Sequence, residues 1–488
     1  MTGLAIAGLR GGTGKTVISL GITAAWKADG LKVAPFKKGP DYIDAGWLAQ
    51  AAGRPCYNLD TFMCTPQQVR HSFLKNSLDS DIALIEGNRG LYDCIDVQGE
   101  TSTAEIAKFL KIPLFLIVDC TKSTRTIAAL VMGCTHFDPD LNIMGIVLNR
   151  VAGKRHEGKV RDNIEKHCGI PVFGAVPKLT SRDFPERHMG LVPSAEHRFT
   201  DASIKAVAKI ARDNINLKGL YESSLTVSRE LSDESVQSHP PFIPGRTDSA
   251  PGDIVFTTAC RSYEKAPVIG VLKDSAFQFY YPDNLEALEH EGARLKMISP
   301  LRDKRLPEVD ALYIGGGFPE THAGKLAANR SFCEDVKRSA KAGMPIYAEC
   351  GGLMFLGKSL RLDNQSFPMA GVLPIVFGLS KKPVGHGYTK VTVIHSNPFF
   401  KIGEKIKGHE FRYSKVLDID FHQKDMVFSM DRGKGIIDQL DGFCWKNVLG
   451  TYTHIHAAGM PVWAEALVDR ALEYGNLTGR IKTSAPVF

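Results

Sequence analysis

Cys350 is the residue of this chain best placed to act as a nucleophile. An apolar run at residues 345–348 leads to Glu349 and Cys350, a glycine pair follows at 351 and 352, and a new apolar run begins at 353. This order predicts a strand, a tight turn and a helix, with the cysteine at the apex. There a thiol lies beside backbone N–H groups and a helix N-terminus, which favour thiolate and can stabilise an oxyanion. The alternative is a buried structural cysteine before a glycine cap.

A glycine-rich loop at residues 8–16 predicts a phosphate site. Gly12 and Gly14 allow backbone N–H groups to wrap a phosphate, Lys15 can reach the outer phosphates, and the Thr16 hydroxyl can bind Mg²⁺. The loop follows an apolar run and opens a helical pattern, as a phosphate loop should. It resembles the deviant Walker loop, with Arg10 in the position of that loop's signature lysine.

Magnesium also needs carboxylate ligands. Glu86 and Asp119 each end an apolar run, and Asp41 and Asp44 follow a basic pair at residues 37 and 38. Any of these could instead cap a helix or lie in a solvated loop. Asn149, which ends another apolar run, could read a nucleobase edge or belong to an ordinary turn.

The composition indicates an ordinary globular protein of two or three domains. The 488 residues are 43% hydrophobic and 23% charged, with a formal charge of +7. We find no run of five or six like charges and therefore expect no nucleic-acid partner. The ten cysteines show no C-x-x-C pair, which argues against a zinc site or a redox dithiol. The first residues run directly into a strand, and no apolar run approaches membrane-spanning length, so we expect a cytoplasmic location and no membrane contact.

The apolar and helical patterns predict two α/β domains. Strands expected at 4–9, 32–36, 82–85, 114–118, 143–148 and 172–176 alternate with helices, the clearest at 16–28, which predicts a parallel sheet in a domain spanning 1–220. Residues 221–265 are polar and proline-bearing and read as a linker. Alternation resumes at 268–272, 295–298, 311–314 and 346–348, so the second α/β domain spans 266–488.

Seven ordered motifs resemble those of the cobyrinate a,c-diamide synthases. Besides the Cys350 segment they lie at residues 38–44, 86–93, 185–193, 279–285, 315–320 and 408–414, and the resemblance covers nearly the whole chain. It implies a P-loop, ATP-dependent amide ligase domain related to dethiobiotin synthetase. A class I glutamine amidotransferase-like α/β domain would follow.

The resemblance also implies roles for individual residues. Cys350 would attack the side-chain amide of L-glutamine and release ammonia, with His454 as its base. Lys15 and Thr16 would serve ATP phosphates and Mg²⁺, and Asp41 and Glu86 would be further Mg²⁺ ligands. The ligase domain would phosphorylate the a- and c-acetate carboxylates of a tetrapyrrole, which ammonia then converts to amides. A homodimer is the candidate assembly.

The sequence departs from the family pattern in ways that leave questions open. Many class I amidotransferases carry a glutamate two residues after the catalytic histidine, but this chain has His456 there, so another group must orient His454. Backbone N–H groups of Gly316 or Gly317 and of Gly351 are candidates for an oxyanion hole. Residues 457–464 look more like relatives that amidate sirohaem or nickel-sirohydrochlorin, which remain alternative substrates.

Two other readings remain open. A deviant-Walker switch ATPase of the partitioning type would explain the loop but not Cys350 and His454. A decayed amidotransferase half that relies on free ammonia would explain the absent triad glutamate, although the intact Cys350 segment argues against it.

Overall fold

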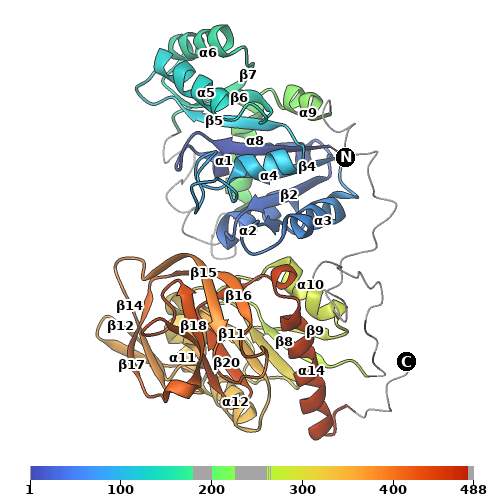
Figure 1. Cartoon of the computed structure of the whole chain (residues 1–488), viewed down its shortest axis with the longest axis vertical. Coiled ribbons are helices and arrows are strands. Elements are labelled where there is room, and N and C mark those ends of the chain that lie inside the picture. The colour runs from blue at the N-terminus through green and yellow to red at the C-terminus, as the bar shows by residue number, and fades with distance from the viewer. Residues whose placement is uncertain (1, 180–199, 226–260, 262, 264, 482–488) are drawn as a thin grey trace. The chain divides into compact units, whose positions relative to one another are not determined.

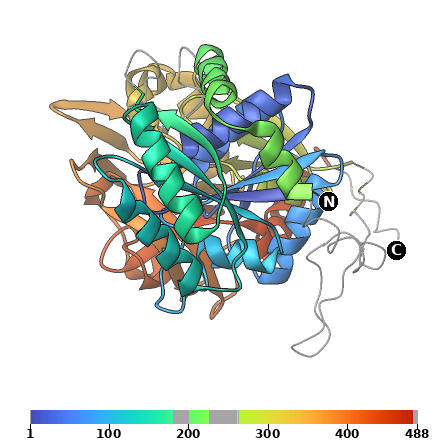
Figure 2. The same ribbon diagram turned by 90° about the horizontal axis from the view of Figure 1, so that it is seen from above.

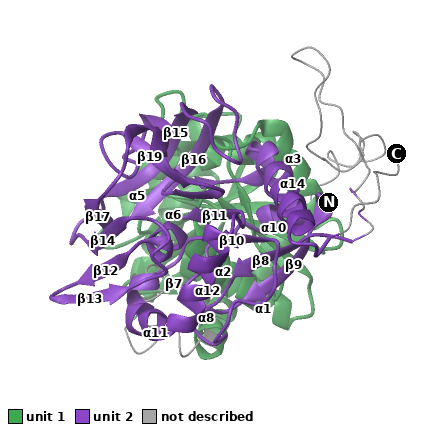
Figure 3. Ribbon diagram, turned by 90° about the horizontal axis from the view of Figure 1, so that it is seen from below, with its two compact units in different colours: residues 1–239 green, residues 240–488 purple. Residues whose placement is uncertain are grey.

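The computed structural model describes residues 2–179, 200–225, 261, 263 and 265–481. The chain divides into two compact units, residues 1–239 and 240–488, which Figure 3 shows in different colours. The motif at 185–193 and the Pro- and Ser-rich stretch at 226–260 lie outside the described residues.

The first unit is built on a seven-stranded parallel sheet with the order β3-β2-β4-β1-β5-β6-β7. Its strands are largely buried apolar runs, as expected where a parallel sheet is covered on both faces. The six predicted strands are confirmed, and the short β3 was missed. The strands are β1 (Gly3–Gly8), β2 (Val33–Lys38), β3 (Tyr57–Leu59), β4 (Ile82–Glu86), β5 (Leu114–Asp119), β6 (Ile143–Val151) and β7 (Val172–Pro177).

Helices connect these strands. α1 contacts both α2 and α8, while α5 and α6 pack side by side and run alongside the strands of this unit (Figures 1 and 2). The helices are α1 (Lys15–Ala28), α2 (Tyr42–Ala52), α3 (Pro66–Ser77), α4 (Thr103–Phe109), α5 (Arg125–Phe137), α6 (Lys154–Cys168), α8 (Thr200–Asn214) and α9 (Leu217–Leu225). α9 continues to Leu225 with Leu220 and Ser224 buried, so it overlaps the first residues of the stretch expected to be a linker.

The strand order places a topological switch at β1. From β1 the chain crosses to β2 on one side, and from β4 it crosses to β5 and then β6 on the other. Ligands of such sheets bind at the carboxyl ends of the strands around this point. Gly8, Lys38, Glu86, Asp119 and Asn149 all lie at or near these ends, so the fold gathers the residues predicted for nucleotide and metal.

The second unit contains a ten-stranded mixed sheet and a smaller four-stranded sheet. In the large sheet β9, β8, β10, β11 and β20 pair in parallel, and the rest pair antiparallel. The parallel part was predicted up to β11. The antiparallel part was missed because its strands are half-exposed, as in β15, and lack continuous apolar runs.

The bounds of these strands follow the order of each sheet. The large sheet runs β21 (His454–Ile455), β16 (Lys405–Arg412), β15 (Gly385–Val393), β18 (Met426–Arg432), β19 (Leu440–Trp445), β20 (Val448–Thr451), β11 (Ile346–Glu349), β10 (Ala311–Ile314), β8 (Val268–Leu272) and β9 (Arg294–Ile298). The small sheet runs β13 (Gln365–Pro368), β12 (Ser359–Leu362), β14 (Ile375–Leu379) and β17 (Ser414–Ile419).

Five α-helices and three short 3₁₀ turns complete the described part of this unit. The helices are α10 (Pro282–His290), α11 (Ala323–Ala328), α12 (Arg330–Lys341), α13 (Gly351–Leu356) and α14 (Val462–Leu477). The turns are η3 (Pro319–His322), η4 (Gln423–Asp425) and η5 (Ala457–Gly459). Within the described residues, no helix has both the length and the apolar character that crossing a bilayer would require.

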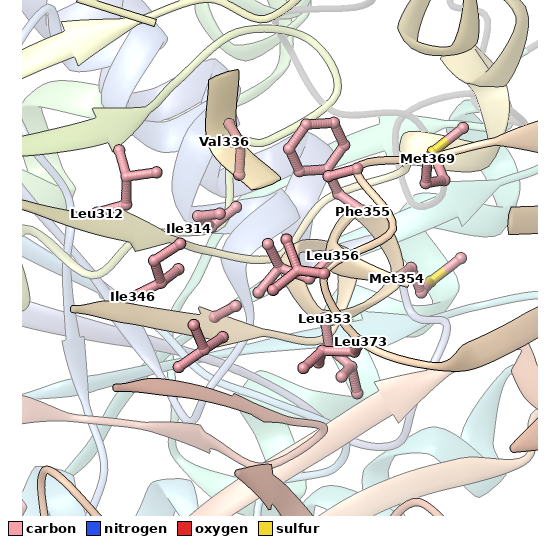
Figure 4. Close-up of a cluster of buried hydrophobic side chains, with 14 of the residues drawn as sticks. Leu312, Ile314, Val336, Ile346, Leu353, Met354, Phe355, Leu356, Met369 and Leu373 are labelled. Carbon is pink, nitrogen blue, oxygen red and sulfur yellow. The ribbon is translucent and has the colours of Figure 1, made fainter. Parts of the chain in front are cut away.

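The helix α13 is anchored in the core of this unit. Figure 4 shows side chains of α13 among those of β10, β11 and α12. Leu353 and Leu356 are fully buried there, together with Ile314 and Ile346 of the strands. Full burial of one leucine side chain stabilises a fold by about 1.5–3 kcal/mol. The helix that follows Cys350 is therefore fixed by packing rather than by its own length.

Candidate active sites

Cys350 lies in a tight turn between β11 and α13. The strand ends at Glu349 and the helix begins at Gly351, as the sequence predicts. Cys350 itself has a positive φ of 48°, which non-glycine residues rarely adopt. A conformation of this kind costs roughly 1–3 kcal/mol and is found where a site over-determines it. Its backbone N–H donates to the Thr451 carbonyl at 2.7 Å, which fixes the turn to β20.

Glycines bring backbone close to the thiol-bearing turn. A methyl group on Gly316 would lie 2.5 Å from Cε1 of His454, so the imidazole packs directly on that residue. A methyl on Gly351 would lie 2.9 Å from the Gly317 nitrogen, so the backbones of these two glycines also meet. The structure thus places Gly316 against His454 and Gly317 against Gly351, the residue that follows Cys350.

His454 is brought to Cys350 by β21, which pairs with β16. The imidazole is buried, with 2% of the side chain exposed, and hydrogen bonds with Cys350. Burial alone would lower the pKa of His454, but the hydrogen bonds with Cys350 and Glu349 raise it to about 10. His454 therefore carries a proton beside the sulfur, which is the state needed to protonate a leaving amine.

Glu349 is a site residue that the sequence analysis did not assign. Its side chain is fully buried, and Oε2 lies 3.4 Å from Nδ1 of His454. The hydroxyl of Tyr313 donates to Oε2 at 3.2 Å, and the Ile455 N–H donates to Oε1 at 3.1 Å. The signal was its place at the strand end directly before Cys350, but only the pairing of distant strands shows that it meets His454.

His456 lies apart from this contact. Its Nε2 is 3.4 Å from Oδ2 of Asp283, and its ring lies 4.8 Å from that of Tyr281. The position two residues after His454 therefore contributes no carboxylate. The carboxylate that lies next to the His454 ring is that of Glu349 instead.

Asp441 fixes the segment that leads from β20 to His454. Its buried carboxylate accepts from the Thr451 hydroxyl at 2.7 Å, the Tyr452 N–H at 2.9 Å and both the N–H and hydroxyl of Thr453, at 3.0 and 2.9 Å. Four donors on one carboxylate compensate its burial. Asp441 was missed because it lies on β19, outside every motif.

His409 packs against the imidazole of His454. It is paired with His454 across β16 and β21, and the two rings lie 4.9 Å apart and tilted by 32°. Its Nε2 hydrogen bonds with the Tyr281 hydroxyl at 2.7 Å. Burial, and then the charge of His454, hold the pKa of His409 well below its usual value, so this ring is neutral. The motifs at 279–285 and 408–414 thus meet where Tyr281 contacts His409, which in turn packs against His454.

The phosphate loop of the first unit leads directly into α1. Gly12 and Gly14 both have positive φ, 74° and 87°, and helix α1 begins at Lys15. Lys15 is buried and donates to the Arg89 carbonyl. The turn that the glycines form is therefore the one expected of a phosphate loop, with Lys15 at the helix start.

The side chain of Asn149 hydrogen bonds to the backbone of this loop. Its Nδ2 donates to the Thr13 carbonyl at 2.7 Å, and its Oδ1 accepts from the Arg150 N–H at 2.9 Å. A methyl on Gly14 would lie 2.3 Å from this Nδ2, so the loop rests directly on the amide. The residue predicted to read a nucleobase edge thus contacts backbone on both sides and positions the loop.

Thr16 and Glu86, two of the predicted metal ligands, meet at the carboxyl end of β4. The Thr16 hydroxyl donates to Oε1 of Glu86 at 2.8 Å and lies 3.4 Å from Oδ2 of Asp44. The Lys37 ammonium lies between the same two carboxylates, 2.7 Å from Asp44 and 2.8 Å from Glu86. Burial would lower the pKa of Lys37, but Asp44 and Glu86 together raise it.

Asp41, the third predicted ligand, is used differently. Its Oδ1 accepts from the backbone N–H of Ile43 at 2.9 Å and of Asp44 at 3.0 Å, so it is the N-cap of α2. Burial and the neighbouring Asp44 raise the pKa of Asp41 to about 7. The carboxylate that faces Thr16 is that of Asp44. The sequence could not separate these two acids, because they lie three residues apart in one motif.

The donor set around Thr16 suits magnesium that arrives with phosphates. Oε2 of Glu86 is buried and accepts no hydrogen bond, which leaves an oxygen free for a cation. Within the described residues, no three acidic, histidine or cysteine side chains form a complete metal site. Mg²⁺ commonly takes one or two carboxylates and completes its shell with phosphate oxygens and water. Thr16, Glu86 and Asp44 fit that pattern.

Arg10, at the signature position of the deviant loop, is engaged within its own unit. Its guanidinium donates to Oδ2 of Asp119 at 3.1 Å, and Arg150 donates to the same oxygen at 3.0 Å. Arg150 also donates to the Gly12 carbonyl at 3.0 Å. The two arginines and Asp119 therefore brace the phosphate loop from the ends of β5 and β6.

Comparison with known proteins identifies both units. Residues 4–192 match the CobQ/CobB/MinD/ParA nucleotide binding domain, and residues 268–462 match the CobB/CobQ-like glutamine amidotransferase domain. A cobyrinate a,c-diamide synthase from Magnetococcus marinus is 39% identical over 97% of this chain and 98% of its own length. Those of Archaeoglobus fulgidus and Caldanaerobacter subterraneus are 37% and 36% identical, each over 96% of this chain and 97% and 98% of their own lengths. The chain belongs to the cobyrinate a,c-diamide synthase family and is a glutamine-dependent ligase with a nucleotide-binding P-loop domain.

Proposed function

We propose that this protein converts the a- and c-acetate carboxylates of cobyrinate to primary amides, using ATP and the amide nitrogen of glutamine. The proposal is supported by relatives that bear this name along nearly their full length. It is carried by one observation, the buried set of Cys350, His454 and Glu349 in a chain that also holds a phosphate loop. A nitrogen-releasing site and an ATP site together suit an amide ligase.

The second unit supplies the nitrogen. The Cys350 thiolate attacks the side-chain amide carbon of glutamine, and the oxyanion that forms faces backbone N–H groups of the surrounding glycines. Collapse of this intermediate breaks the C–N bond, and His454 gives its proton to the departing nitrogen, releasing ammonia. Water then attacks the thioester, with His454 accepting a proton, which frees glutamate and restores the thiolate.

The first unit activates the acceptor. A carboxylate oxygen of the tetrapyrrole attacks the γ-phosphorus of ATP, forming an acyl phosphate and ADP. Lys15 positions the phosphates, while Thr16, Glu86 and Asp44 would hold Mg²⁺, which neutralises phosphate charge when bound. Ammonia attacks the acyl carbon, phosphate leaves, and a proton is lost to give the amide. The reaction runs twice, once at each acetate.

The test is incubation with Mg-ATP and glutamine against cobyrinate, sirohaem and nickel-sirohydrochlorin, with mass spectrometry counting the amides. We expect two amides on cobyrinate and two ATP consumed. Conversion of one of the other macrocycles instead would keep the reaction and overturn the substrate. ATP hydrolysis stimulated by DNA or membranes, with no glutaminase, would overturn the ligase and favour a switch ATPase. A cytoplasmic location and a homodimer belong to the same proposal, and the mass of the protein in solution tests the latter.

A further inference from the structure

His454 needs a partner on the nitrogen that does not face the thiol. Its Nδ1 is turned to Glu349, at 3.4 Å from Oε2, which leaves Nε2 for Cys350. An imidazole with a hydrogen-bond acceptor on one nitrogen is fixed in orientation and tautomer, so that the other nitrogen can exchange a proton with the nucleophile. In this chain the acceptor does not come from position 456, which holds a histidine.

The carboxylate of Glu349 is itself held on both oxygens. Tyr313 on β10 donates to Oε2, and the Ile455 N–H, next to His454, donates to Oε1. Glu349 therefore contacts the backbone beside His454 as well as its ring. Tyr313 comes before Glu349 in the sequence and Ile455 comes after it. Because both oxygens are bound by separate strands, the carboxylate has little freedom to rotate. A fully buried carboxylate without such partners would be costly.

Two other carboxylates in this neighbourhood have partners of their own. Asp283 lies 3.4 Å from His456, whose ring packs against that of Tyr281. Both carboxylate oxygens of Asp441 accept hydrogen bonds from residues 451–453. Glu349 is thus the carboxylate with the geometry to orient the catalytic imidazole.

We propose that Glu349, the residue directly before the nucleophile, is the positioning residue of the glutaminase site and takes the place of the glutamate that many amidotransferases carry after their histidine. This inference rests on the glutaminase role proposed for Cys350 and His454. Glu349 and Cys350, consecutive residues at the end of β11, then face opposite nitrogens of the His454 imidazole. The positioning carboxylate is therefore next to the nucleophile in the sequence.

The experiment compares Glu349→Gln with wild type in the full-length enzyme. Gln keeps the shape but loses the charge, so we expect a fall of about 10- to 1000-fold in kcat for glutamine hydrolysis, with a nearly unchanged KM for glutamine. Alkylation of Cys350 by a glutamine-analogue affinity label should slow in parallel. Ammonia-dependent amidation should stay close to wild type, because a merely structural role would lower this activity as well.

Two further variants make the result decisive. Asp283→Asn removes the carboxylate near His456 and should leave glutamine hydrolysis within about 2-fold of wild type; equal damage from the two substitutions would overturn the assignment. If Glu349→Gln does not fold, Tyr313→Phe decides, because it removes one donor to Glu349 and keeps the charge. We expect about a 3- to 10-fold loss of kcat there, and wild-type kcat would overturn the proposal. Absence of ammonia-dependent amidation in the wild type itself would instead count against the proposed function.

Discussion

The backbone N–H of Cys350 donates to the carbonyl of Thr451 at 2.7 Å, three residues before His454. This bond continues the parallel register of β11 and β20, in which Glu349 is paired with Thr451. Cys350 therefore directly follows β11, and His454 lies three residues after the end of β20, the neighbouring strand of the sheet. Main-chain pairing of β11 with β20 and the side chain of Asp441, which holds residues 451–453, together fix the position of His454 relative to Cys350.

Replacing Cys350 with alanine should separate the two halves of the reaction. Without the thiol no thioester can form, so glutamine-dependent amidation should fall below about 1% of wild type, because covalent and acid–base catalysis are both lost. Amidation from ammonium salts at raised pH should persist, since the phosphate loop is untouched. Loss of both activities in a folded protein, measured by mass spectrometry of the product, would contradict a separate nitrogen-releasing site.

Replacing Lys15 with alanine should stop amidation from either nitrogen source. Its ammonium lies at the start of α1, where the outer phosphates are expected, and losing one such charge typically costs about 10²–10³-fold in rate. Thioester formation at Cys350, followed as glutamate release without ATP, should remain measurable. Ammonia-driven product at wild-type rate in this variant would remove Lys15 from the phosphate site.

Replacing Gly316 with alanine should disable glutamine hydrolysis through geometry alone. The added methyl would lie 2.5 Å from Cε1 of His454, closer than any real contact, and the imidazole must move. We expect at least about a 100-fold loss of kcat, since small misplacements at a reacting centre have costs of this size. The matched control is Gly324→Ala on α11, where the nearest atom to the new methyl is 3.8 Å away. Similar losses in both variants would show that the damage is not specific to His454.

The raised pKa of His454 gives the stability of the protein a definite pH dependence. Its folded value of about 10 lies above the unperturbed value of roughly 6.5, so its stabilising contribution is complete below that lower value and is lost as pH rises through about 10. The thermal midpoint of wild type should therefore exceed that of His454→Gln by more at pH 7 than at pH 10. A difference that stays constant or grows between these pH values would contradict a protonated His454.

The sequence was informative where chemistry is encoded locally. The loop around Lys15 and the turn at Cys350 each combine glycines, a reactive residue and the change from strand to helix within about ten residues, and both were predicted with their elements. Glu349 could be noticed at the end of a predicted strand, but its contact with His454 could not be predicted, because His454 lies 105 residues further on. That contact depends on the parallel pairing of β11 with β20, which places Glu349 opposite Thr451, three residues before His454.

Contacts between loops were also beyond prediction. Asn149 rests on Thr13, which is 136 residues away, and only the parallel order of the strands places it under the phosphate loop. Asp41 and Asp44 are too close in sequence to be told apart by type, and the start of α2 decides which one caps the helix. Asp441 carried no signal, because a lone acid in a half-exposed strand is common.

The Lys37 ammonium, with only 2% of its side chain exposed, offsets one of the two negative charges of Glu86 and Asp44 in the first unit. Glu86 and Asp44 already share a resident counter-ion, so this unit should fold and persist in the presence of a chelator. A divalent cation entering alone would compete with that ammonium for the same two carboxylates. A cation that enters bound to a triphosphate is already paired with the negative charge of the phosphates. It therefore does not have to displace the Lys37 ammonium. We therefore expect an order of addition in which metal and nucleotide enter together.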